Sequence, residues 1–244
     1  MNDDITQNIP VVILAGGFGT RISDVKKRMP KSLVKIGKYP IIYHIIKNFE
    51  IHGFQKFIIC TGYRHNEVDN YFRKNNLFKH LDIRIKNTGL YSNTGLRIKK
   101  IEDYIENLFV LTYCDSLTNL NFKKLLREFK REDKLGIITA VNPKSRFGII
   151  SIKDKNSVYD FNEKSIIKNF WVNAGYYIFK KKIFSYIPKR NCIFESDILP
   201  KLAKKKLLIS HKHNGFWKCM DTIKDRNELN KIWYGKKKIP WKIW

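Results

Sequence analysis

The stretch Val11-Val12-Ile13-Leu14-Ala15-Gly16-Gly17-Phe18-Gly19-Thr20-Arg21, with Pro30-Lys31 a little further on, decides the fold. Its apolar start is rich in β-branched residues and predicts a buried strand. Glycines end that strand, and because glycine has no side chain, the backbone N–H groups there can approach an anion closely. Arg21 and Lys31 add positive charge on either side. The stretch therefore predicts a strand that leads into a polyphosphate-binding loop, the alternative being a tight strand-to-helix turn.

The loop differs from two common phosphate-binding motifs. A Walker A loop ends in Gly-Lys-Ser or Gly-Lys-Thr, which this stretch lacks, and a dinucleotide-binding fingerprint needs a third glycine where Ile22 stands. The pattern therefore favours another kind of nucleotide site.

Outward from the loop, the chain alternates apolar strands with helical patterns. Helices are expected from Pro40 to about Phe49 and through Val68–Phe72, and strands at Phe57–Cys60, Ile83–Ile85 and Phe109–Tyr113. This alternation predicts a Rossmann-like, mostly parallel mixed sheet with helices on both faces. Ligands of such sheets bind beyond the carboxyl ends of the strands, where the glycine loop begins.

The C-terminal half has shorter strands, for which antiparallel pairing is expected. They are predicted at Ile137–Val141, Phe147–Ile152 and Val172–Phe179, with helices at Glu195–Lys204 and about Lys224–Trp233. Because no linker composition and no internal repeat interrupts the chain, we expect a single domain over residues 1–244.

Composition limits which binding partners and which cellular location are expected for the protein. The net charge of +26 in 244 residues suits anionic substrates, and the lysines are spread along the chain without a nucleic-acid-binding signature, so no specific nucleic acid is expected. No apolar run is long enough to cross a membrane, the first residues are acidic, and the four cysteines are far apart. These features predict a cytoplasmic protein without a membrane partner, whose cysteines serve packing.

Two acidic residues follow apolar strands and could act together. Asp115 comes after Phe109–Tyr113, and Asp221 ends the run Gly215–Met220. Mg²⁺ prefers oxygen ligands and keeps several waters, so this pair of carboxylates predicts a Mg²⁺ site. The alternatives are a turn cap for Asp115 and a helix N-cap for Asp221.

The glycine loop followed by Pro30-Lys31 resembles the nucleotide-binding signature of the sugar-phosphate nucleotidyltransferases. The resemblance extends from Val11 to Trp244, and the runs Asn87–Gly89, Thr94–Arg97, His213–Trp217, Met220–Thr222 and Pro240–Lys242 are similar to its cytidylyltransferase subfamily. It implies a GT-A type fold and a Mg²⁺-dependent reaction of CTP with α-D-glucose 1-phosphate to CDP-glucose and pyrophosphate, which serves O-antigen synthesis. Alternatives are another pair of substrates, such as GTP with a heptose 1-phosphate, or a catalytically weakened nucleotide- or polyanion-binding homologue. A homo-oligomer is left open.

The resemblance also implies roles for individual residues. Arg21 and Lys31 would be catalytic, and Asp115 and Asp221 would bind the metal. Nucleotide contacts are implied for Leu14, Ala15, Gly16, Gly17, Gly19, Thr20, Arg21, Lys31, Ser92, Arg97 and Cys114, and sugar-phosphate contacts for Arg146, Gly148, Glu163, Lys164, Asn173 and Gly175. The chain departs from the family's usual Gly-Asp-Gly at Cys114-Asp115-Ser116, and Leu96 stands in place of a glycine.

Overall fold

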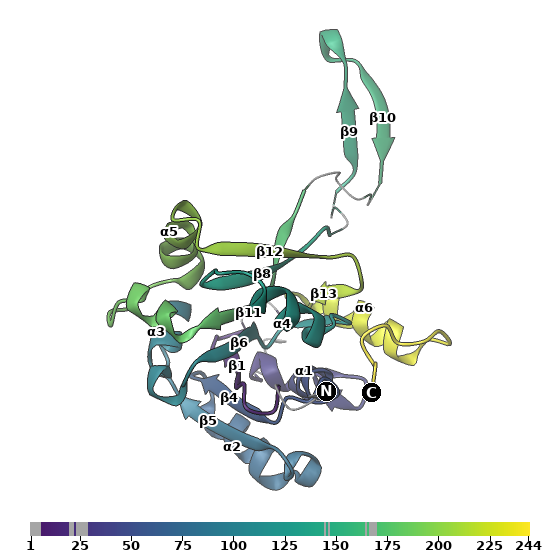
Figure 1. Cartoon of the computed structure of the whole chain (residues 1–244). Coiled ribbons are helices and arrows are strands. Elements are labelled where there is room, and N and C mark those ends of the chain that lie inside the picture. The colour runs from purple at the N-terminus through teal and green to yellow at the C-terminus, as the bar shows by residue number, and fades with distance from the viewer. Residues whose placement is uncertain are drawn as a thin grey trace.

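A central mixed sheet organises the molecule (Figure 1). The computed structural model describes residues 6–19, 22, 29–143, 145, 147–163, 165 and 170–244, without the Lys155 side chain. Within these residues the strand order is β12-β8-β11-β6-β1-β4-β5. The strands are β1 (Val11–Ala15), β4 (Lys56–Thr61), β5 (Asp82–Asn87), β6 (Leu108–Tyr113), β8 (Gly136–Val141), β11 (Val172–Lys180) and β12 (Leu208–His213).

The pairing confirms the predicted mixed and mostly parallel sheet. Strand β1 lies parallel between β4 and β6, and β5 continues this parallel half beyond β4. Strand β11 runs antiparallel to both β6 and β8, as expected for the C-terminal half. Strand β12, which the sequence patterns did not predict, is parallel to β8.

Helices cover both faces of the sheet, as predicted. One face packs against α1 (Ile41–Glu50), α2 (His65–Lys74), α4 (Phe122–Lys130) and α6 (Ile223–Tyr234), and the other against α3 (Thr94–Lys99) and α5 (Leu199–Lys204). Side chains of β1 alternate between the two cores: Val11 and Ile13 belong to one, Val12 and Leu14 to the other. Complete burial of each such side chain contributes about 1.5–3 kcal/mol, which is why the strand is continuously apolar.

The helix predicted at Glu195–Lys204 is correct in extent but not uniform. Its first part, Phe194–Ile198, is a π-helix, and α5 continues from Leu199 with Pro200 in the first turn, where proline is tolerated.

Short ribbons complete the described structure. Strands β2 (Lys35–Ile36) and β3 (Tyr39–Pro40) form one, and β7 (Ser116–Thr118) pairs with β13 (Trp217–Cys219) in another. A hairpin of β9 (Ile149–Ile152) and β10 (Val158–Asn162) projects far from the body (Figure 1). None of the helices in the described part of the chain is both long and apolar enough to span a bilayer.

The C-terminal segment packs against α1 through aromatic rings. The ring of His44, on α1, is completely buried and lies within 5.0–6.2 Å of the ring centroids of Trp233, Trp241 and Trp244. Its Nε2 contacts the carbonyl oxygen of Ile36 at 2.9 Å. Burial, only partly offset by that hydrogen bond, lowers the pKa of His44 to about 4, so the ring is neutral at pH 7.

Candidate active site

A cleft of about 530 Å³ lies at the carboxyl ends of β1 and β6, the edge where the sequence predicts the ligand. The glycine loop forms one wall, and the segment before α3 forms another. Its lining residues are Leu14, Gly16, Gly17, Phe18, Gly19, Ile22, Lys31, Leu90, Tyr91, Ser92, Asn93, Thr94, Arg97, Tyr113, Cys114, Asp115 and Asp221.

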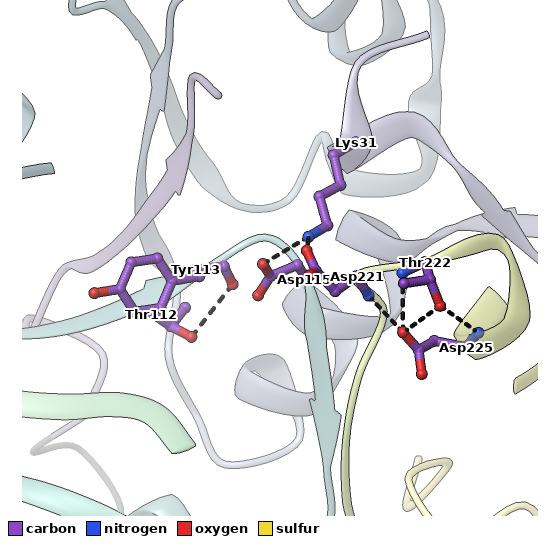
Figure 2. Close-up of polar contacts among 7 residues, drawn as sticks. All are labelled: Lys31, Thr112, Tyr113, Asp115, Asp221, Thr222 and Asp225. Atoms are coloured by element: carbon purple, nitrogen blue, oxygen red, sulfur yellow. Dashed lines mark hydrogen bonds and ion pairs between the residues drawn. The ribbon is translucent and has the colours of Figure 1, made fainter. Parts of the chain in front are cut away.

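Lys31 joins the two predicted metal ligands (Figure 2), and all three residues line this cleft. Its ammonium group donates hydrogen bonds to Asp115 Oδ2 and to Asp221 Oδ1, each at 3.0 Å. The Lys31 side chain is 14% exposed. Burial alone would lower its pKa, but the Asp115 charge and the hydrogen bonds to both carboxylates outweigh burial and raise the pKa above its ordinary value. The ammonium therefore stays charged at any pH near neutrality.

The ribbon of β7 and β13 brings these distant carboxylates together. Asp115 lies between β6 and β7, and Cys219 of β13 pairs with Ser116 of β7. Just beyond this pair, the Met220 N–H donates to the carbonyl oxygen of Asp115 at 2.7 Å. The backbone ladder thus fixes the separation between the Asp115 and Asp221 segments before any ligand binds.

Helix α6 begins with a capping box beside Asp221 (Figure 2). The Thr222 hydroxyl accepts from the Asp225 N–H at 3.2 Å, and Asp225 Oδ2 accepts from the N–H groups of Thr222 and Asp221 at 2.9 and 3.2 Å. The helix cap is therefore Thr222 and not Asp221. The alternative interpretation of Asp221 as an N-cap is wrong, and its side chain contacts Lys31 instead.

The Arg97 side chain is hydrogen-bonded to the backbone of the glycine loop. Its guanidinium donates to the carbonyl oxygens of Gly16 at 2.9 Å and Thr61 at 3.0 Å, and to the Thr88 hydroxyl at 2.7 Å. A Cβ atom on Gly16 would lie 2.1 Å from this guanidinium, so any side chain there would displace the guanidinium from its hydrogen bonds. Arg97 thus positions the loop, while its predicted direct contact with the nucleotide stays a prediction.

Other predicted nucleotide contacts line the cleft in different ways. Gly19 has φ +62°, the left-handed region that glycine tolerates, and a Cβ there would come within 3.2 Å of Lys31 Cβ. A Cβ on Gly17 would meet nothing within 4 Å, so this residue faces open space. The Ser92 hydroxyl donates to the Thr88 carbonyl oxygen at 2.6 Å. Leu14 and Ala15 are buried and end β1, and only Leu14 of the two lines the cleft.

Aromatic rings form the outer rim, a feature that sequence patterns did not indicate. The Phe18 ring centroid lies 5.3 Å from that of Tyr63 and 6.3 Å from that of Tyr91. Phe18 is 43% exposed and Tyr91 is 79% exposed, so both rings offer apolar surface to whatever enters the cleft. Phe18 and Tyr91 stand in two different segments of the cleft lining, and a single aromatic residue in a loop gives no sign that the two rings meet.

The thiols near the two carboxylates are neutral. Burial and the Asp115 charge raise the pKa of both Cys114 and Cys219 to about 12. A thiol that keeps its proton is a poor nucleophile and metal ligand. Ser116, the other departure from Gly-Asp-Gly, is buried at 2% exposure and does not line the cleft, whereas Cys114 does.

The described residues of the predicted sugar-phosphate segments, Gly148, Glu163, Asn173 and Gly175, lie outside the cleft lining. Gly175 has φ +79° and its missing Cβ makes room for the Tyr113 ring, 2.7 Å from that position. The Asn173 side chain bonds to Tyr177 and to the Gly175 N–H. Gly148 and Glu163 face each other at the base of the β9–β10 hairpin.

A polar network that sequence reasoning missed links this region to the cleft. The Tyr113 hydroxyl donates to the Glu195 carboxylate, which also accepts from the Thr94 hydroxyl at 2.7 Å. Burial first, then the neighbouring Tyr177 and Glu195, raise the pKa of Tyr113. Of the other predicted site residues, Thr20, Arg21, Arg146 and Lys164 lie outside the described residues.

The pair of carboxylates suits a hard cation. Among the residues that the structure describes, no group of three or more His, Cys, Asp or Glu side chains could hold a metal ion. Asp115 and Asp221 nevertheless enclose a positive charge already, that of Lys31. Because Mg²⁺ is commonly held by one or two carboxylates together with substrate phosphates, this donor set fits it.

A family model described as "Nucleotidyl transferase" matches residues 10–232. The chain belongs to this nucleotidyltransferase family, and it is an enzyme of this class. Among individual proteins, it is 33% identical to the glucose-1-phosphate cytidylyltransferase of Salmonella typhimurium over 257 aligned residues, which cover 96% of this chain and 98% of that protein.

Solved structures agree with this placement. The chain superposes on HddC from Yersinia pseudotuberculosis, solved in complex with GMP-PN, with a TM-score of 0.71 and 28% identity over 92% of this chain and 99% of the other. It superposes on a UDP-glucose pyrophosphorylase with a TM-score of 0.70 at 20% identity, which covers 94% and 99% and shows a shared fold.

Proposed function

We propose that the chain transfers CMP from CTP to α-D-glucose 1-phosphate, giving CDP-glucose and pyrophosphate. The observation that carries this proposal is the convergence of Lys31, Asp115 and Asp221 beside the glycine loop. Similarity to glucose-1-phosphate cytidylyltransferase over nearly the whole chain supports the choice of substrates.

The reaction asks little covalent work of the protein. A phosphate oxygen of the sugar phosphate attacks the α-phosphorus of CTP, the bond from that phosphorus to the bridging oxygen breaks, and pyrophosphate leaves with that oxygen. The protein must align the reactants and neutralise negative charge. Lys31 supplies a permanently charged ammonium, and the glycine loop supplies backbone N–H groups. Mg²⁺, held by Asp115 and Asp221, would neutralise triphosphate charge.

A substrate panel tests the proposal. Pyrophosphate release is measured with CTP, UTP, GTP and dTTP, each against glucose 1-phosphate and several other sugar phosphates, with and without Mg²⁺. We expect the fastest turnover with CTP and glucose 1-phosphate, and none when either substrate is omitted. No turnover with any pair would contradict the proposal, and binding of CTP without turnover would favour a catalytically weakened homologue.

GTP and a heptose 1-phosphate belong in that panel as the second candidate pair. The observation that favours them is the structural match to HddC, solved with GMP-PN. A preference for GTP over CTP would replace the first proposal while keeping nucleotidyl transfer.

The variant Asp115→Asn tests the role of the carboxylate pair. It keeps the shape of the side chain but removes the charge, so we expect kcat to fall by about a hundredfold or more, since charge stabilisation in the transition state is typically that large. The control Asp133→Asn changes a fully exposed carboxylate remote from the cleft and should keep normal kcat. Full activity of Asp115→Asn, with an unchanged circular dichroism spectrum, would remove Asp115 from the reaction.

A further inference from the structure

A short segment of the chain, residues 191–195, supports the cleft wall that precedes α3. The Asn191 side chain accepts a hydrogen bond from the Asn93 N–H at 2.7 Å and donates one to the Tyr91 carbonyl oxygen at 3.1 Å. Both of these partners line the cleft. Their backbone is therefore held in place by a segment that lies about a hundred residues further along the chain.

Glu195 is the residue of this segment that contacts two sides of the cleft. Its Oε2 accepts a hydrogen bond from the Thr94 hydroxyl at 2.7 Å, and its Oε1 accepts one from the Tyr113 hydroxyl. The Thr94 hydroxyl itself accepts from the Phe194 N–H at 2.8 Å. Because Thr94 begins α3 and Tyr113 ends β6 two residues before Asp115, the carboxylate fixes how far the α3 wall lies from the strand end that leads to Asp115.

This bridge depends on a carboxylate and on two hydroxyls that keep their protons. Burial, and then the neighbouring Tyr177 and Glu195, raise the pKa of Tyr113, so its hydroxyl stays a donor. A carboxylate offers two acceptor oxygens, one for each hydroxyl, whereas an amide of the same size offers one. Glu195 also lies in the π-helix Phe194–Ile198, and π-helical turns are rare and often occur at functional sites.

We propose that Glu195 is a positioning residue for nucleotidyl transfer, which acts through Thr94 and Tyr113 to hold the α3 wall at the spacing from Asp115 that the bound triphosphate requires. Of these described residues, Thr94, Tyr113 and Asp115 line the cleft and Glu195 does not. The inference rests on the proposed function, since it places a nucleotide in the cleft. A misplacement of about 1 Å can cost about a hundredfold in rate, so a loosened wall slows the reaction although every group in the cleft remains.

The variant Glu195→Gln tests the inference. One hydroxyl then loses its acceptor, so we expect kcat/KM to fall by about tenfold to a hundredfold, with a lower kcat and a higher KM for the nucleotide. Circular dichroism should show a chain that is fully folded at the assay temperature. The matched control is Asp197→Asn in the same π-helix, because the Asp197 carboxylate accepts from the Ile193 N–H and the Ser196 hydroxyl. It should keep normal kcat/KM.

Variants of Thr94 show whether Glu195 acts through that hydroxyl. Thr94→Val keeps the shape of the side chain and should lower kcat/KM, whereas Thr94→Ser keeps the hydroxyl and should retain most of the activity. The double variant Thr94→Val with Glu195→Gln should lie within about threefold of Glu195→Gln alone, because both changes remove the same contact. Two effects that multiply would overturn the inference, since the residues would then act independently.

The wild-type chain tests the proposed function, and the variants test this inference. Rates are compared with whichever substrate pair turns over fastest, so a preference for GTP leaves the inference intact. If no pair turns over, the proposed function fails, and the Kd of CTP and of GTP from calorimetry replaces kcat/KM. Glu195→Gln should then bind the tighter of the two nucleotides more weakly by about tenfold or more.

Hydrogen exchange of the free chain gives a readout that needs no substrate. Amides of residues 91–95 should exchange faster in Glu195→Gln than in the wild type or in Asp197→Asn, because the wall has lost a support. Unchanged exchange there, or a normal kcat/KM or Kd in Glu195→Gln, would overturn the inference. A wild-type chain that neither turns over nor binds any nucleotide would overturn it together with the proposed function.

Discussion

Lys31 neutralises the charges of two carboxylates at once. Its removal tests two roles of the ammonium group, one in catalysis and one in balancing the charges of Asp115 and Asp221. The variant Lys31→Met should lose nucleotidyl transfer, because a charge that would face the triphosphate is gone. Asp115 and Asp221 would then repel each other in the free chain, so a divalent cation should bind more tightly than in the wild type. Thermal unfolding with and without Mg²⁺ measures this, with a larger rise in Tm expected for the variant. An equal rise in both proteins would show that the carboxylates do not bind the ion.

The pH dependence of this ion pair follows from the raised pKa of Lys31. A raised pKa in the folded state gives stability that is fully present below the unfolded value of about 10.4 and is lost only as pH rises through the folded value. Any change in activity between neutral pH and mild alkali therefore belongs to other groups.

Alanine variants of two adjacent glycines in the loop distinguish an effect on protein stability from an effect on ligand binding. Gly16→Ala would place a Cβ 2.1 Å from the Arg97 guanidinium, so we expect a lower Tm and a higher KM for the nucleotide. Gly17→Ala meets no atom within 4 Å and should unfold at the wild-type temperature. If Gly17 lies against the triphosphate, its alanine variant raises KM without a change in Tm. Equal Tm values for the two variants would contradict the positioning role of Arg97.

At the scale of residues the sequence predicted that the glycine loop and the pair of aspartates would meet, because each follows an apolar strand. Lys31 was predicted from the Pro30-Lys31 pair that follows the loop. The sequence did not predict that Arg97 would bind backbone oxygens beneath the loop, nor that Glu195 would bind Tyr113. Those contacts join segments far apart in the chain, and an arginine or glutamate in a helical pattern gives no sign of its partner.

At the scale of elements, the capping box of α6 holds the backbone of Asp221 in place. Thr222→Ala removes half of the capping box and should cost about 1 kcal/mol in the free energy of unfolding. Because Asp225 also holds the Asp221 backbone, activity should fall as well. The matched control is Asn121→Ala, which removes the side-chain cap of α4, with a bond of 2.9 Å to the Lys124 N–H. It should cost similar stability and leave kcat unchanged. A normal kcat in Thr222→Ala would show that Asp221 does not need this support.

The contact between α1 and the C-terminal tryptophans makes stability depend on pH. The folded-state pKa of His44 is about 4, below its ordinary 6.5, so protons bind preferentially to the unfolded chain as pH falls between these values. Stability is therefore lost as pH falls, by about 2 kcal/mol between roughly pH 7.5 and pH 5 from this residue.

Urea unfolding at both pH values measures that loss. The variant His44→Gln should lose less stability on acidification than the wild type, by about that amount. His80→Gln, which alters a side chain that is 57% exposed, serves as the control. Identical pH dependence of His44→Gln and the wild type would show that His44 is not the group that titrates.

Most elements with several periodic apolar residues were predicted from sequence, and so was the apolar run that ends at Asp221, but the pairing of the short strands was not. Strands β7 and β13 each span three residues, too few to show alternation, and their pairing depends on chain segments about a hundred residues apart. Yet this ribbon sets the distance between the two carboxylates. Sequence patterns therefore could not predict the part of the site that depends on pairing between distant segments.

For the whole molecule, the charge of +26 predicts weak and unselective binding of polyanions. Affinity for single-stranded DNA of different base compositions should be similar and should fall steeply as salt rises, because binding releases counterions from the phosphates. Fluorescence anisotropy at increasing ionic strength checks this. A strong preference for one sequence at physiological salt would contradict the expectation that no specific nucleic acid is a partner.

The hydrogen bonds of Lys31 join positions 84 and 190 residues apart along the chain. During synthesis the glycine-rich segment leaves the ribosome long before Asp221, because 190 residues separate Lys31 from Asp221. A product that ends between them contains the phosphate loop without its second carboxylate. Fragments of this kind from a broken messenger RNA should therefore be inactive however well their first half folds.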